Sequence, residues 1–158
     1  VDVAGAETKK ITVANLTGAS GILTQVVNVV DNAAVLTMKY DDTPITLVGK
    51  IAGKIIVPVG ITIVATAAGT TETASSNLHF GWDAGNSTTV DYFGSIRNAM
   101  KNIASPDVNA QTVAPFGSAW TTSYTATPVN QDLQAWSTAV YVGGWSMTIY
   151  TTYYTITV

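Results

Sequence analysis

The chain has 158 residues, with seven basic and ten acidic side chains and a formal net charge of −3. This length fits one domain of ordinary size. Hydrophobic residues make up 47% of the chain and charged residues 11%, which excludes the apolar-poor, highly charged composition of a disordered protein. The acidic balance argues against a nucleic-acid binder, which normally presents a basic face. Because the chain has no cysteine and one histidine, disulfides, thiolate metal sites and most histidine metal sites are excluded.

The first half of the chain contains no candidate for a membrane helix. Its longest uncharged apolar stretch, Ile55–Gly69, is shorter than the roughly 20 residues that a membrane helix needs, and Pro58 and Gly60 interrupt it. The chain also begins without the charged and apolar segments of a signal peptide. We therefore expect a soluble domain with no membrane partner, in which Ile55–Gly69 forms buried strands.

Short runs of β-branched residues, separated by turn residues, recur along almost the whole chain and predict strands. Pro58 lacks a donor for the strand ladder, so it indicates an edge position or a bulge. Gly143-Gly144 predicts a hairpin turn, and Asp31-Asn32 predicts a turn between two strands. The predicted strands are Thr8–Leu16, Ile22–Val30, Ala34–Tyr40, Ile45–Ile51, Lys54–Ala68, Asn77–Trp82, Ala110–Ala114, Ala119–Ala126, Leu133–Val142 and Trp145–Val158.

This succession of strands predicts an all-β fold, because no alternating helical pattern accompanies it. We expect one domain over residues 1–158, an antiparallel β-sandwich that is jelly-roll-like. One short helix is predicted near residues 92–104, ended by Ser105-Pro106. Its apolar residues follow the spacing i, i+3, i+7 and i+10, which places them on one face of a helix: Phe93, Ile96, Met100 and Ile103.

The last third of the chain is almost without charge. All seven Lys and Arg residues lie at or before Lys101, and Asp132 is the only charge after Asp107. Because bare strand edges pair with other chains, an exposed uncharged strand over Trp145–Val158 would be an aggregation hazard. Either this strand is central in its own sheet, or neighbouring subunits cover the surface in a symmetric oligomer or a capsid-like lattice. We expect both, a central last strand and wide contacts between subunits of a homo-oligomer.

His79 is the one residue on which a serine-type hydrolase could be built. Alternation along its predicted strand places it on the face opposite to Leu78, Phe80 and Trp82. A hydrolase would also need a nucleophile in its context, and the chain has no G-x-S-x-G motif. We therefore interpret His79 as a packed or surface residue and expect no catalytic residue and no enzyme activity.

The carboxylates form no recognisable acid–base pair or metal motif. Asp41 and Asp42 are adjacent, so they point apart and fit a turn better than an acid–base pair. Asp83, Asn86 and Asp91 could supply oxygen ligands to calcium from one loop, but their spacing lacks the D-x-D-x-D-G pattern. No glycine-rich phosphate-binding motif occurs either. We expect neither a metal nor a cofactor.

The aromatic residues of the second half are candidates for a subunit interface or for glycan stacking. Exposed rings on a sandwich face can stack on sugars, whereas buried rings are ordinary core and interface material. The candidates are Trp120, Tyr124, Trp136, Tyr141, Trp145, Tyr150, Tyr153 and Tyr154.

Part of the chain resembles small structural proteins of tailed bacteriophages. The resemblance covers Thr43–Gly85 and the closing strand MTIYTTYYTITV. It consists of a strand led by Thr43-Pro44, an apolar strand that starts at Gly53-Lys54, the Thr/Ser-rich connector Gly69–Ser76 and the strand Leu78–Gly81. The resemblance implies a β-sandwich component of the virion, such as a capsid decoration protein, a head fibre or a tail protein.

Composition and resemblance together favour a non-enzymatic bacteriophage virion structural protein, a capsid decoration or accessory protein located in the virion. Its expected partners are copies of itself and other virion proteins of the capsid or tail. The alternative is a carbohydrate-binding sandwich module, either a tail receptor-binding domain or a secreted adhesin, which binds a host surface glycan. Exposed aromatic rings would favour this alternative.

Overall fold

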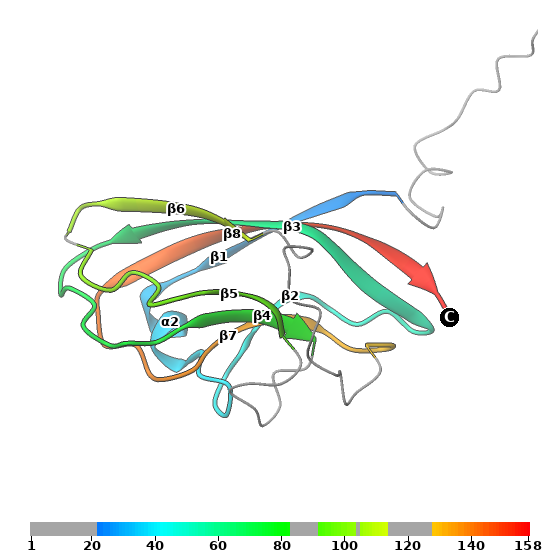
Figure 1. Cartoon of the computed structure of the whole chain (residues 1–158), viewed down its shortest axis with the longest axis horizontal. Helices are drawn as coiled ribbons and strands as arrows, with labels where there is room; N and C mark the ends of the chain where they lie inside the picture. Colours follow the sequence, from blue (N-terminus) through cyan, green and yellow to red (C-terminus); the bar gives the residue numbers. More distant parts are fainter. Residues whose placement is uncertain (1–21, 83–91, 104, 114–127) are drawn as a thin grey trace, which may run out of the picture.

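A computed structural model describes residues 22–82, 92–103, 105–113 and 128–158, and these residues form a two-layer β-sandwich (Figure 1). Its strands form two antiparallel four-stranded sheets. Sheet A has the strand order β1-β8-β3-β6, and sheet B has the order β2-β7-β4-β5. The elements are β1 (Thr24–Val30), α2 (Asn32–Thr37), β2 (Ile45–Val48), β3 (Lys54–Ala67), β4 (Leu78–Trp82), β5 (Tyr92–Ile96), β6 (Val108–Val113), β7 (Leu133–Ser137) and β8 (Trp145–Thr157).

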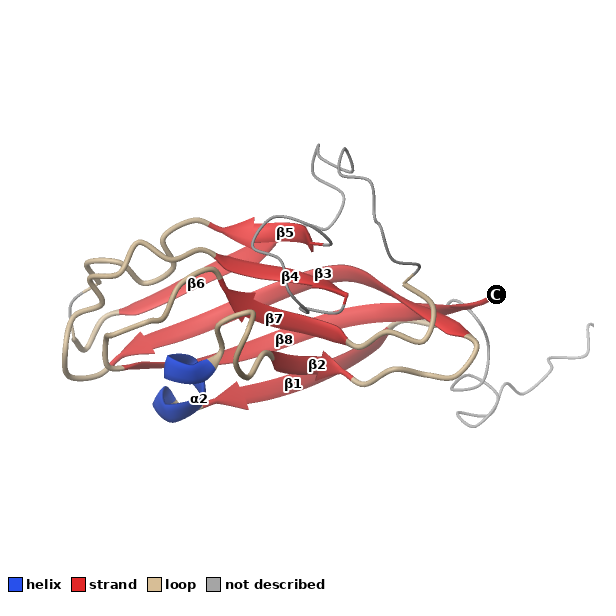
Figure 2. Ribbon diagram, turned by 90° about the horizontal axis from the view of Figure 1, so that it is seen from below, coloured by secondary structure: helices blue, strands red, loops and turns tan. Residues whose placement is uncertain are grey.

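The connections between these strands follow the jelly-roll order. The chain passes from one sheet to the other after every strand except β4, which forms a hairpin with β5 inside sheet B. The flanks of the sandwich are closed because β1 contacts β2 and β5 contacts β6. Figure 2 shows the strands of both sheets running in nearly the same direction, as in an aligned sandwich. The predicted all-β, antiparallel, jelly-roll-like sandwich is therefore confirmed.

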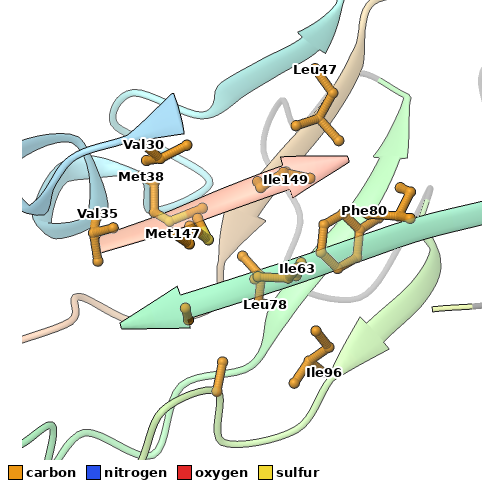
Figure 3. Close-up of a cluster of buried hydrophobic side chains, with 14 of the residues drawn as sticks. Val30, Val35, Met38, Leu47, Ile63, Leu78, Phe80, Ile96, Met147 and Ile149 are labelled. Carbon is orange, nitrogen blue, oxygen red and sulfur yellow. The ribbon is translucent and has the colours of Figure 1, made fainter. Parts of the chain in front are cut away.

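The core lies between the two sheets and is built by alternate residues of each strand. Along β8, Met147 and Ile149 point inward, and Leu78 and Phe80 of β4 meet them from sheet B (Figure 3). Trp82 adds a polar contact across the core, since its Nε1 donates to the carbonyl oxygen of Ile56 at 2.8 Å. Each fully buried side chain of this size stabilises the fold by roughly 1.5–3 kcal/mol.

The predicted position of the last strand and the predicted bulge at Pro58 are both confirmed. β8 lies between β1 and β3, so it is central in sheet A. The register of β3 against β8 shifts between Pro58 and Gly60, as expected for a residue without a backbone donor. β6 pairs with β3 only from Ile61 to Thr66. Pro58 lies outside this paired segment, so its missing N–H group removes no hydrogen bond to β6.

The helix predicted near residues 92–104 is wrong for the described part of that segment. Tyr92–Ile96 is the strand β5, and turns follow it. Three of the following residues have positive φ angles of 48–61°, which no continuous helix contains: Asn98, Met100 and Asn102. The apolar spacing nevertheless identified buried positions, because Ile96 and Met100 are buried in the core.

The one described helix lies where the sequence predicted a turn and the strand Ala34–Tyr40. Asp31 caps α2, since its Oδ1 accepts the N–H group of Ala34 at 2.9 Å. Val35 and Met38, three residues apart, carry the buried side of this short segment. A helix of six residues offers too few positions for its periodicity to be recognised.

The hairpin predicted at Gly143-Gly144 is also wrong, because this dipeptide links β7 of sheet B to β8 of sheet A. β7 ends at Ser137, earlier than predicted, and residues 138–144 form the link. Gly144 exchanges backbone hydrogen bonds with the segment after β3, donating to Thr70 and accepting from Ala68, each at 2.7 Å. The predicted strands Thr8–Leu16 and Ala119–Ala126 lie outside the described residues.

Gly144→Ala should lower the free energy of unfolding by about 3 kcal/mol or more, because the added Cβ would overlap the carbonyl oxygen of Ala68. Gly49→Ala is the matched control, since a Cβ there meets no atom within 4 Å. Urea denaturation of both variants measures the difference. Equal stability of the two variants would contradict the close approach at Gly144.

Candidate interaction surface

The side of sheet A that faces away from sheet B presents a broad polar but uncharged surface, which we call the outer face. Alternation along each strand assigns its residues, since their neighbours in sequence are the ones that point into the core. The outer face consists of Gln25, Val27 and Val29 of β1; Ile55, Val57, Gly60, Thr62, Val64 and Thr66 of β3; Val108, Ala110 and Thr112 of β6; and Ser146, Thr148, Tyr150, Thr152, Tyr154 and Ile156 of β8.

No residue of the outer face carries a charge. Among all residues of the four strands, Lys54 alone is charged, and it lies at the start of β3 on the side of the inward-facing Ile56. Several apolar side chains of this face are strongly exposed, with 82% of Val29 and 60% of Val108 accessible to solvent. A water-facing sheet normally carries polar and charged side chains on its solvated side.

Strand register arranges the outer face in rows that cross the sheet. One row runs through Val27, Tyr150, Thr62 and Thr112, and the last two are joined by a hydrogen bond between their hydroxyl groups at 3.2 Å. The neighbouring row runs through Val29, Thr148, Val64 and Ala110. Short, β-branched side chains thus form a low surface from which Tyr150, 37% exposed, projects.

The corresponding side of sheet B is covered at its centre, although Thr46 and Ser95 on the same side are exposed. His79 and Trp136 point away from the core and are paired across β4 and β7, yet they are only 3% and 0% exposed. Their rings meet edge to face, with centroids 6.0 Å apart. Sheet B is therefore buried on both sides at this point, whereas sheet A is buried on one.

The structure places His79 as a packed residue. Burial lowers its pKa to about 4, so the imidazole is neutral at pH 7. The prediction that Leu78, Phe80 and Trp82 share the opposite side of the strand agrees with their burial in the core.

A buried carboxylate that the sequence did not indicate, Glu72, organises the two connections next to the end of sheet A. Glu72 is 2% exposed and accepts four N–H groups. Its Oε1 accepts the N–H group of Ala74 at 2.7 Å, and its Oε2 accepts those of Val142 at 3.1 Å and Gly143 at 2.9 Å. The indole Nε1 of Trp145 donates to the same Oε2 at 3.1 Å. In the described part of the chain, no Lys or Arg is paired with Glu72.

The surroundings of Glu72 explain why this carboxylate is structural. A Cβ on Gly143 would lie 2.6 Å from the Cα of Glu72, so only glycine lets the two segments approach. Tyr141 packs edge to face on Trp145, with ring centroids 4.9 Å apart. Burial raises the pKa of Tyr141, and the charge of Glu72 adds to this effect.

The predicted aromatic residues fall into four groups. Trp136, Tyr141 and Trp145 are at most 2% exposed, so their rings are closed to a sugar or a second subunit. Tyr153 packs against the core from a half-buried position, and Tyr150 and Tyr154 lie on the outer face. Trp120 and Tyr124 lie outside the described residues.

Of the remaining polar candidates, Asp41 and Asp42 lie in the described part of the chain. Asp41 pairs with Lys39 at 2.9 Å, and the hydrogen bond from this lysine holds the pKa of the carboxyl below its usual range. Asp83, Asn86 and Asp91, considered for calcium, lie outside the described residues. Among the residues that are described, no three His, Asp or Glu side chains are grouped as metal ligands, and no helix is long and apolar enough to cross a membrane.

A small apolar cavity between the sheets, of about 20 Å³, is lined by residues that include Ile63, Leu78 and Trp145. This volume holds about one water molecule, so the cavity is not a ligand site. The outer face is therefore the strongest candidate for function in the described part of the chain. No protein-family model matches this chain, and no curated protein matches it in sequence.

Glu72→Gln should lower the free energy of unfolding by about 2–4 kcal/mol, because the new amide NH₂ would face the N–H donors of the β7–β8 link. The control is Asp107→Asn, which neutralises an exposed carboxylate and should change stability by less than about 0.5 kcal/mol. Chemical denaturation at pH 7 compares them. Equal effects of the two substitutions would show that the Glu72 carboxylate is not needed.

His79 should make the protein lose stability as the pH falls from 6.5 to 4. The unfolded chain binds a proton near pH 6.5, but the folded chain binds it only near pH 4, so acid favours unfolding by up to about 3 kcal/mol. His79→Gln removes this contribution. The difference in free energy of unfolding between wild type and variant, measured across this range, should therefore change with pH. Parallel pH profiles would contradict the neutral buried histidine.

Proposed function

We propose that this chain is a non-enzymatic structural protein of a bacteriophage virion, a capsid decoration or accessory protein that stabilises the particle through subunit contacts. The observation that carries the proposal is the exposed, uncharged outer face of sheet A. Soluble domains usually interleave charges of both signs over their surface and keep contiguous apolar patches small. A face of Thr, Val and Tyr is suited to burial in an interface, where charged residues are depleted and aromatic residues enriched.

Two further arguments support the proposal. The first is the resemblance of Thr43–Gly85 and the closing strand to small structural proteins of tailed phages. The second is an analogy of fold, since jelly rolls occur in viral capsid proteins as well as in lectins. Fold alone does not define function, so the outer face remains the main argument.

One observation favours the alternative, a carbohydrate-binding module. Tyr150 and Tyr154 stand on the outer face four residues apart along β8, and two such rings on a flat sheet can stack on the sugars of an extended polysaccharide. Threonine hydroxyls around them could hydrogen-bond to the same chain. Because most of this face consists of Thr and Val, we rank this alternative second.

The proposal predicts that the chain is a stoichiometric component of phage particles. Particles purified on a density gradient should yield its peptides by mass spectrometry, with chymotrypsin as protease because no Lys or Arg follows Lys101. Recombinant Gly60→Lys should bind depleted particles at least tenfold more weakly than wild type, since an interface would bury the new charge. The matched control Gly49→Lys should bind normally, because both glycines have open space but only Gly60 lies on the outer face.

Two results would count against the proposal: no peptide of the chain in purified particles, or equal binding of the two lysine variants. Retention of wild type on an insoluble polysaccharide, lost in Tyr150→Ala, would favour the carbohydrate-binding alternative.

A further inference from the structure

We infer that the outer face of sheet A is covered by the outer face of a second copy of this chain, with the two copies related by a twofold axis. The inference rests on the proposed function in one respect: both require the outer face to be buried in the assembled state. It adds the identity of the partner on this face.

Charge is the first argument for a second copy. A twofold interface sets each surface against itself, so any cluster of like charges on it would repel its own copy. The outer face contains no charged residue and therefore packs on itself without repulsion. A different protein as partner would normally be selected by complementary charges, and this face offers none to complement.

Area is the second argument. β3 and β8 have 14 and 13 residues, and β1 and β6 have seven and six. With about 3.3 Å per residue and about 4.8 Å between strands, the four strands span roughly 600 Å². Two such faces together bury about 1,200 Å², which is the lower end of the range for specific, stable interfaces. The outer face alone is thus large enough to hold two copies together.

The shape of the outer face is the third argument. A Cβ on Gly60 would meet no atom within 4 Å, so the outer face is open above this residue. Gly60 pairs with Thr152, which lies between Tyr150 and Tyr154 on β8. Two tyrosines of the outer face therefore lie beside an open position, close to the middle of β3. A twofold axis there lets tyrosines of each copy pack over the open position of the other, as a well-packed interface requires.

Charge complementation at Gly60 tests the inference. Wild type should be a dimer in sedimentation velocity and light scattering. Gly60→Lys alone and Gly60→Asp alone should each weaken dimerisation at least tenfold, because like charges meet near the axis. An equimolar mixture of the two variants should restore dimers to within about threefold of wild type. Gly49→Lys and Gly49→Asp, alone or mixed, should dimerise as wild type does.

A second pair, Thr152→Lys with Thr152→Asp, repeats the test on β8, because Thr152 pairs with Gly60 and so lies near the same axis. Thermal unfolding checks that every variant is folded. Wild type that stays monomeric at high concentration overturns the inference, as do dimers unaffected by either pair of charges. If such a monomer still binds particles and Gly60→Lys does not, another virion protein covers the outer face and the proposed function stands. Dimers that complement as expected, from a chain absent from particles, would keep the inference and reject the proposed function.

Discussion

The buried carboxylate of Glu72 is the interaction on which the closed end of the sandwich depends. A buried carboxylate is stable only when hydrogen bonds satisfy it, and Glu72 receives four from N–H groups. Two of these come from the link between β7 and β8 and a third from Trp145 at the start of β8, whereas Glu72 itself belongs to the connection between β3 and β4. Gly143 is needed at this point because a side chain would exclude Glu72. The carboxylate, the glycine and the Trp145 indole thus form one unit that holds two crossings between the sheets.

This unit fixes where β8 begins, and β8 in turn determines the character of sheet A. Its inward residues Met147 and Ile149 enter the core, while Thr148 and Tyr150 face away from it. β-branched and aromatic residues favour strands, and in β8 they alternate between the core and the outer face. Sheet B differs because its far side is covered at His79 and Trp136. In the described part of the chain, the outer face of sheet A is therefore the broad uncovered face that we propose to be buried against a partner.

Local patterns predicted the strands and the bulge at Pro58, because alternation and a missing donor are properties of a short segment. Contacts between distant segments determine the features that the sequence did not predict. Asn102 adopts its positive φ where its N–H group donates to the carbonyl oxygen of Glu72, so an apolar spacing that fits a helix became a strand and turns. A Gly-Gly dipeptide is compatible both with a hairpin turn and with a link between two sheets, so Gly143-Gly144 alone did not distinguish between them. The Glu72 cluster joins residues about 70 positions apart, and no local pattern indicates such a contact.

A central position explains only part of the missing charge in the last strand. Being central satisfies the backbone groups of β8 on both sides, which removes the risk of edge pairing. It does not explain the outward side chains, because those of a central strand face the same surroundings as those of an edge strand. Tyr150 and its neighbours on β1, β3 and β6 form a row in which no position is charged, although every one points away from the core. Pairing within the sheet therefore accounts for the uncharged backbone edge of β8, and the burial of the outer face that we propose would account for its side chains, so the two explanations are compatible.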